Sequence, residues 1–128
     1  MNLKSALAKN NLTLPSPPAK GGIYDSVVTF SNNLCYLSGC GPVLNGKQMM
    51  TGKLNNPYTV EEGQEAARYC TLNLLANLQN EIGDLNRVKK IVKMLCFVAS
   101  ENDFYSQPQV ANGASQLLID VFGEEIGS

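Results

Sequence analysis

The residues best suited to chemistry lie in the stretch 21–42, which reads GGIYDSVVTFSNNLCYLSGCGP. It ends in Ser38, Gly39 and Cys40, where a hydroxyl stands beside glycine backbone that a ligand can approach closely. Tyr24 comes just before the first strand of a predicted hairpin, so its phenol can reach the same end. Together these neutral donors could hold a small carboxylate or keto group. In the plainer interpretation, Ser38 bonds to nearby backbone and Tyr24 packs half-buried with its hydroxyl in water.

The composition narrows this chemistry because the 128 residues include no histidine. Histidine bases, Ser-His-Asp or Cys-His nucleophile pairs and histidine metal ligands are therefore excluded. The net charge is −1, so no global field attracts nucleic acid or an anionic membrane. No apolar run approaches the roughly 20 residues that span a bilayer, and the N-terminus lacks a signal-peptide core. We expect one cytoplasmic domain over residues 1–128.

Four cysteines, Cys35, Cys40, Cys70 and Cys96, are scattered along the chain without a C-x-x-C pair. This spacing argues against a zinc site, and we expect neither a metal nor a cofactor. Each cysteine lies in or beside an apolar run, which predicts reduced and mostly buried thiols without a disulfide. Because Cys40 lies in the glycine-rich turn, we expect it to be the most accessible of the four.

Two apolar runs, 26–30 and 34–38, flank a turn at Ser31-Asn32-Asn33 and predict a β-hairpin. Asn45-Gly46 suits a second, type I′ turn. Residues 1–11 could form a short helix. Residues 12–22 contain three prolines and predict an extended arm that either lies on the body or is a free linker.

Two amphipathic helices are expected further along. Thr59 and Glu62 form a capping box before a helix that ends near Gly83. Its apolar stripe comprises Ala67, Cys70, Leu74 and Leu78, and the asparagines beside it are interpreted as solvated. Ser106 and Gln109 suggest a second capping box, before a helix that ends at Gly123.

Residues 88–98 are predicted to form a third strand between the helices, because they are rich in apolar and β-branched residues. One face would carry Val92, Met94, Cys96 and Val98, and the other Ile91, Leu95 and Phe97. The two helices can cover only one face of a sheet built from these strands. The uncovered apolar face predicts self-association.

Taken as an ordered set, Tyr24, the hairpin and Leu37-Ser38-Gly39-x-Gly-Pro42 resemble the Rid family, the reactive intermediate deaminases. This family is also called YjgF or "L-PSP endoribonuclease", and the resemblance continues through residues 59–84 and 88–104. It implies an α+β, chorismate-mutase-like fold with a mixed β-sheet and two helices packed on one face. It also implies a homotrimer with small-molecule ligand clefts between subunits. By resemblance, Tyr24 and Ser38 are the catalytic candidates, and Gly39 and Cys40 join Tyr24 in substrate binding.

Rid-like deaminases hydrolyse small enamines and imines to 2-keto acids and ammonia, and an arginine holds the substrate carboxylate. In the family this arginine follows the second helix, and a closing strand supplies a glutamate. The given sequence ends at Ser128, about where that segment begins in the family, so we expect the family's C-terminal strands to be missing after residue 128. The two arginines present, Arg68 and Arg87, do not match the motif.

Three functions therefore stay open. The first is a hydrolytic deaminase of reactive enamines and imines. The second is a non-catalytic, metabolite-binding homotrimer of the same fold. The third is an endoribonuclease or translation inhibitor. Against the third stand the missing histidine, the lack of a basic stripe and the lack of clustered aromatic residues.

Overall fold

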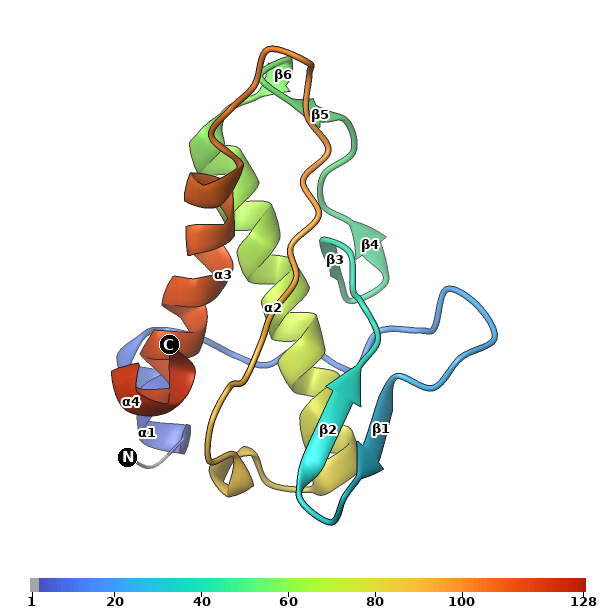
Figure 1. Ribbon diagram of the computed structural model, residues 1–128, viewed down its shortest axis with the longest axis vertical. Coiled ribbons are helices and arrows are strands. Elements are labelled where there is room, and N and C mark those ends of the chain that lie inside the picture. The colour runs from blue at the N-terminus through green and yellow to red at the C-terminus, as the bar shows by residue number, and fades with distance from the viewer. Residues whose placement is uncertain (1–2) are drawn as a thin grey trace.

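The computed structural model describes residues 3–128, so the first two residues of the predicted N-terminal helix lie outside it. Its framework is a pair of helices, α2 (Val60–Ile82) and α3 (Gln107–Phe122), which pack against each other along their length (Figure 1). Two short helices, α1 (Leu3–Lys9) and α4 (Glu124–Gly127), pack against α3. The predicted helices are thus present.

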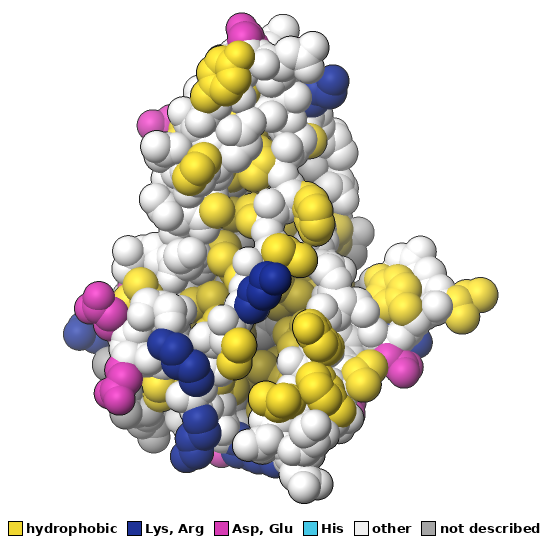
Figure 2. All heavy atoms as spheres, in the orientation of Figure 1, with side chains coloured by type: hydrophobic (Ala, Val, Ile, Leu, Met, Phe, Trp, Pro, Cys, Tyr) yellow, Lys and Arg dark blue, Asp and Glu magenta, His cyan; other side chains and the backbone are white. Residues whose placement is uncertain are grey.

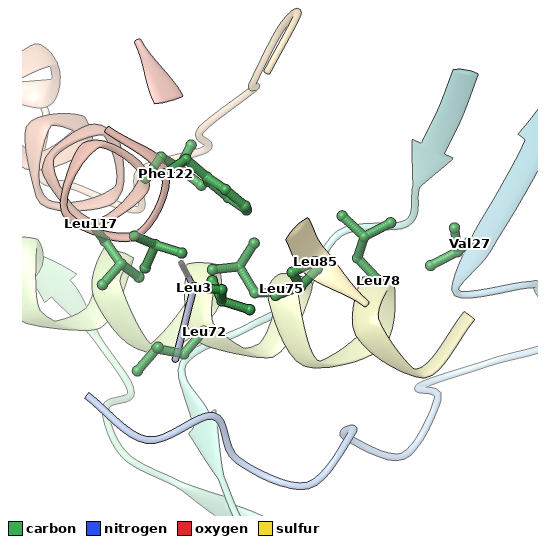
Figure 3. Packing of buried hydrophobic residues seen from close by; sticks show 10 residues of the cluster. Leu3, Val27, Leu72, Leu75, Leu78, Leu85, Leu117 and Phe122 are labelled. Carbon is green, nitrogen blue, oxygen red and sulfur yellow. The ribbon is translucent and has the colours of Figure 1, made fainter. Parts of the chain in front are cut away.

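The main apolar core forms where these helices meet a short 3-10 turn, η1 (Leu85–Arg87). Leu85 and Leu117 are fully buried there. Figure 3 shows leucines of α2 directed toward Leu3 of α1 at one side, with Val27 of the hairpin beside Leu78. The core therefore ties the hairpin to α2, which fixes the end of the hairpin that carries Ser38.

Local capping explains where the helices begin and end. The Thr59 hydroxyl accepts a hydrogen bond from the Glu62 N–H, and the Glu62 carboxylate accepts one from the Thr59 N–H, so the predicted capping box is confirmed. Gly83 ends α2 with φ 86°, a conformation that favours glycine. The prediction of a second capping box is wrong, because the Ser106 side chain makes no hydrogen bond that caps α3. Gln107 instead donates to the Ser100 hydroxyl and the Phe104 carbonyl.

The strands form three two-stranded sheets among the described residues. β1 (Val27–Phe30) and β2 (Leu34–Leu37) make the predicted antiparallel hairpin, and β3 (Val43–Leu44) pairs with β4 (Lys47–Gln48). Asn45 and Gly46 both have positive φ, as a type I′ turn requires. β5 (Lys53–Leu54) and β6 (Pro57–Tyr58) add a short parallel pair. The α+β class is confirmed.

The predicted third strand is wrong in this chain. Residues 88–98 cross in front of α2 without joining a ladder (Figure 1), and within the described chain the backbone of residues 92–98 makes no hydrogen bond. A strand needs a neighbouring strand, and β2 pairs only with β1. The predicted division of this segment into two faces is also wrong. Ile91 and Met94, predicted on opposite faces, both pack against the core, while Val92, predicted on the same face as Met94, is exposed.

One side of the molecule therefore presents apolar side chains to solvent. Figure 2 shows them gathered over the hairpin and the segment beside it. The exposed apolar face, as named here, comprises Val28, Phe30, Leu34, Tyr36, Val92, Leu95 and Phe97. Phe30 and Tyr36 stack with ring centroids 5.5 Å apart. In the part of the chain that the structure describes, no helix has the length and apolar character needed to cross a membrane.

Candidate functional site

A pocket of about 300 Å³ opens beside the turn that follows β2 and is here called the turn pocket. The arm forms one wall, the turn a second and α2 a third. The structure brings together in it all four residues singled out in the sequence, namely Tyr24, Ser38, Gly39 and Cys40. Pro18, Lys20, Gly41, Val43, Asn73 and Asn77 are among its other lining residues.

Ser38 is held at the end of β2 by two hydrogen bonds. Its N–H donates to the Ser26 carbonyl at 2.9 Å, and its hydroxyl donates to the Asp25 carbonyl at 2.6 Å. Because the hydroxyl proton is engaged, Oγ keeps lone pairs with which it can accept a hydrogen bond from a ligand or a water. The plainer interpretation of Ser38, a hydroxyl bonded to nearby backbone, describes this geometry as well.

Tyr24 is positioned by a tight turn of the arm. Its hydroxyl oxygen accepts a hydrogen bond from the Gly21 N–H at 2.9 Å, and the side chain is partly exposed. The phenolic proton is not used in that bond, so Tyr24 can donate it to a ligand. The turn pocket thus combines a donor from Tyr24 with an acceptor from Ser38.

Two asparagines of α2 were missed by the sequence analysis, which interpreted them as solvated. Asn73 is only 1% exposed, and its Nδ2 donates to the carbonyls of Gly41 at 3.2 Å and Val43 at 2.5 Å. Asn77, one turn later, donates to the Cys40 Sγ at 3.4 Å. The turn is therefore anchored to the helix. The four-residue spacing of Asn73 and Asn77 beside the apolar stripe indicates that both lie on one helix face next to the buried side, and this was the signal available in the sequence.

Replacing Asn73 with alanine should lower the free energy of unfolding by about 1–3 kcal/mol, because two part-buried carbonyls lose their donor. Urea denaturation followed by circular dichroism measures this change. Asn80→Ala is the matched control, because Asn80 is exposed on the same helix. Equal stability of the two variants would contradict the anchoring role of Asn73.

The cysteines differ from expectation. All four are free, which confirms the absence of a disulfide. However, Cys35 and Cys96 are exposed while Cys40 and Cys70 are half-buried, so the expectation that Cys40 is the most accessible is wrong. Cys40 is turned toward α2 by its bond with Asn77. Cys96 is uncovered because its segment has no neighbouring strand.

Burial also changes thiol acidity. Burial, together with a smaller contribution from the nearby thiols of Cys96 and Cys40, raises the pKa of Cys70 from its ordinary value of 9.0 to about 11. Partial desolvation also raises the pKa of Cys96, although its side chain remains exposed to solvent. Burial raises the pKa of Cys40 as well, and the hydrogen bond from Asn77 opposes that shift. The more buried thiols are therefore the weaker nucleophiles at neutral pH.

At pH 8, iodoacetamide should alkylate Cys35 first and Cys70 last. A pKa raised by about two units leaves roughly 100-fold less thiolate at Cys70 than at an ordinary cysteine. Alkylation of Cys70 should keep accelerating up to about pH 11, since the thiolate forms only as pH approaches the raised pKa. Peptide mass spectrometry over a pH series measures each site. Alkylation of Cys70 as fast as Cys35 at pH 8 would contradict this burial.

A second cavity, here called the apolar groove, lies on the other side of Gly39 and Cys40. It has a volume of about 370 Å³ and runs between α2 and residues 94–99. Its lining is mainly apolar and includes Leu54, Ala67, Leu74 and Val98. None of the described residues that line it carries a charged side chain, so it suits packing better than polar chemistry.

The arginines of the chain lie outside the turn pocket. Arg68 pairs with Asp120 at 3.9 Å, and Arg87 donates to the Ile82 carbonyl. Among the described residues, no group of three or more cysteines and carboxylates is arranged to hold a metal ion. The pocket's chemistry therefore rests on hydroxyls, amides, backbone and one lysine.

The fold and the pocket define an α+β protein whose ligand-sized site lies at the end of a hairpin. Over residues 4–127 the chain matches the family described as "YjgF/chorismate_mutase-like, putative endoribonuclease", and it belongs to that family, also called Rid. The chorismate-mutase-like fold is confirmed with it.

Several relatives support this placement. "Protein TCP17" of Trypanosoma cruzi is 43% identical over 121 residues, which cover 94% of this chain and 75% of that protein. A crystal structure described as a putative endoribonuclease, from Shewanella oneidensis, has a TM-score of 0.85 at 32% identity and covers 98% of this chain and 82% of its own. The crystal structure of the protein Atu1372 of Agrobacterium tumefaciens, described as having unknown function, has a TM-score of 0.85 at 35% identity. The match covers 96% of this chain and 75% of Atu1372.

Proposed function

We propose that the chain is a hydrolytic deaminase that converts small reactive imines and enamines to 2-keto acids and ammonia in the turn pocket. The observation that carries the proposal is the convergence of Tyr24, Ser38, Gly39 and Cys40 on one small pocket. Membership of the Rid family supports the reaction class.

The chemistry needs water to add to the carbon of a C=N bond and the nitrogen then to leave. Ser38 Oγ, whose own proton is engaged with Asp25, accepts a hydrogen bond from the attacking water and orients it. The Tyr24 phenol donates its proton to the imine nitrogen, which makes the carbon more electrophilic. The added water returns a proton to Tyr24, which leaves a neutral carbinolamine. The hydroxyl proton of the carbinolamine then passes to its nitrogen through Tyr24, the C–N bond breaks, and ammonia and a keto group are formed.

A trapping assay tests this function. An amino-acid oxidase generates a 2-imino acid, semicarbazide captures what survives, and the protein is added. Tyr24→Phe should reduce the acceleration of imine loss by about 100-fold, the size of a lost proton donor. Ser38→Ala should reduce it by about tenfold, the size of one lost hydrogen bond.

Tyr105→Phe and Ser115→Ala are matched controls, because neither residue lines the turn pocket. Full activity in the controls together with loss in the pocket variants supports the proposal. Imine loss at the uncatalysed rate with wild-type protein would overturn the deaminase function.

A second candidate is a metabolite-binding protein without catalysis. It is favoured by the absence of any arginine among the described residues that line the pocket, since charge-assisted bonds are about twice as strong as neutral ones. Here 2-keto acids would bind at the same residues while imine lifetime stays unchanged. The endoribonuclease description printed for the family receives no support from this pocket, which has neither a histidine nor a basic stripe.

We further propose that three copies associate through the exposed apolar face, so that each turn pocket lies near a subunit boundary. The support is the size of this face and family membership.

A further inference from the structure

We propose that Lys20 is the carboxylate anchor of the turn pocket and the residue that makes it selective for anionic substrates. The inference rests on the proposed function and names the residue that holds the substrate's carboxylate at the same site. Lys20 is the only charged residue among the described residues that line the pocket, and no aspartate or glutamate lines it. The pocket's side chains therefore carry a charge of +1, which favours an anion.

The ammonium group of Lys20 is available to a ligand. Among the described residues, no hydrogen bond or ion pair engages its side chain. By contrast, the Lys90 Nζ is occupied by the carbonyls of Glu125 and Ser128. Lys20 is exposed and lines the pocket, so its flexible stem can reach a bound carboxylate.

The local turn places this charge beside the reacting groups. Gly21 follows Lys20, and its N–H donates to the Tyr24 hydroxyl. That bond closes residues 21–24 into a compact turn with Lys20 at its start. A carboxylate held by Lys20 would thus leave the adjacent carbon of a 2-imino acid near Tyr24 and Ser38. A 2-keto or 2-imino acid fits this arrangement, because its carboxylate can contact Lys20 while the keto or imino group on the adjacent carbon contacts Tyr24 and Ser38.

The rest of the pocket limits the size of the substrate. Its walls near Lys20 include Pro18, Ala19 and Val43, and the volume is about 300 Å³. Small apolar walls suit a short aliphatic side chain. The pocket therefore suits the short-chain anionic substrates of the proposed function, and Lys20 is the residue that discriminates against neutral imines, which leave its charge unmatched.

Titration calorimetry with 2-oxobutanoate and its neutral amide, 2-oxobutanamide, tests the inference. Lys20→Gln should weaken 2-oxobutanoate binding about 5- to 10-fold and leave amide binding unchanged, as expected for one partly exposed charge-assisted bond. Lys20→Arg should retain most of the affinity. Raising the salt concentration to 1 M should weaken binding to wild-type protein but not to Lys20→Gln.

Lys93→Gln is the matched control, because Lys93 is exposed and lies outside the pocket. In the imine assay Lys20→Gln should raise KM for an anionic imine and leave kcat near its wild-type value. If wild-type protein hydrolyses imines and Lys20→Gln matches it in affinity and KM, the Lys20 inference fails while the proposed function stands. If wild-type protein neither binds 2-oxobutanoate nor hydrolyses imines, both fail.

Discussion

Replacing Gly113 with alanine should lower the free energy of unfolding by about 3 kcal/mol, although alanine is intrinsically the better helix former. Gly113 lies where α3 contacts α2. A Cβ atom there would meet the Gln64 carbonyl oxygen and would lie 2.8 Å from the Gln64 Cα. These are backbone atoms of the neighbouring helix, so relief requires the two helices to separate. The loss of packing outweighs the gain in helix propensity.

Urea denaturation of wild-type protein and Gly113→Ala measures this change. The matched control is Asn112→Ala, an exposed position beside it on the same helix. The control should be neutral or slightly stabilising, because only propensity acts there. A rise in stability of about 1 kcal/mol for Gly113→Ala, as propensity alone predicts, would contradict the close approach of α2 and α3.

The second large effect concerns association. Wild-type protein at micromolar concentration should sediment as a trimer, and the double variant Tyr36→Asp with Phe97→Asp should sediment as a 13.8 kDa monomer. Tyr36 is 74% and Phe97 92% exposed in the single chain, on the exposed apolar face. Burying an unpaired carboxylate in an apolar interface costs several kcal/mol. The dissociation constant of the trimer should therefore rise by orders of magnitude in the double variant.

Tyr105→Asp provides the control for this experiment. Tyr105 is 82% exposed but lies just before α3, away from the exposed apolar face. The control variant should remain trimeric. A wild-type chain that sediments only at 13.8 kDa, or a double variant that still associates, would show that this face is not the interface.

The parts of the fold that depend only on residues close together in the sequence could be predicted from it. The capping box of Thr59 and Glu62, the turn at Asn45-Gly46 and the end of α2 at Gly83 all follow from local backbone chemistry. The third strand could not be predicted in the same way. Alternating apolar residues indicate an extended segment, but a strand also needs a hydrogen-bonded neighbour, and residues 92–98 have none in the described chain.

Some residues of the candidate site could likewise be predicted from the sequence, and others could not. Tyr24 and Ser38 could be placed together because the β1–β2 hairpin has a fixed register, which sets Val27 opposite Leu37. Asn73 and Asn77 share a helix face, as their four-residue spacing indicates, but their partners in the distant turn could not be identified from the sequence. Cys40 was misjudged for the same reason, because its exposure depends on a distant helix.

The most direct test of the central claim is to locate a bound 2-keto acid by backbone amide NMR. Titration with 2-oxobutanoate should shift the resonances of Gly21, Tyr24, Ser38 and Gly39, which surround the turn pocket. Residues of α3 that line only the apolar groove, such as Val110 and Ala114, should not move. Shifts confined to the apolar groove, or no shifts at millimolar ligand, would contradict the assignment of the turn pocket as the functional site.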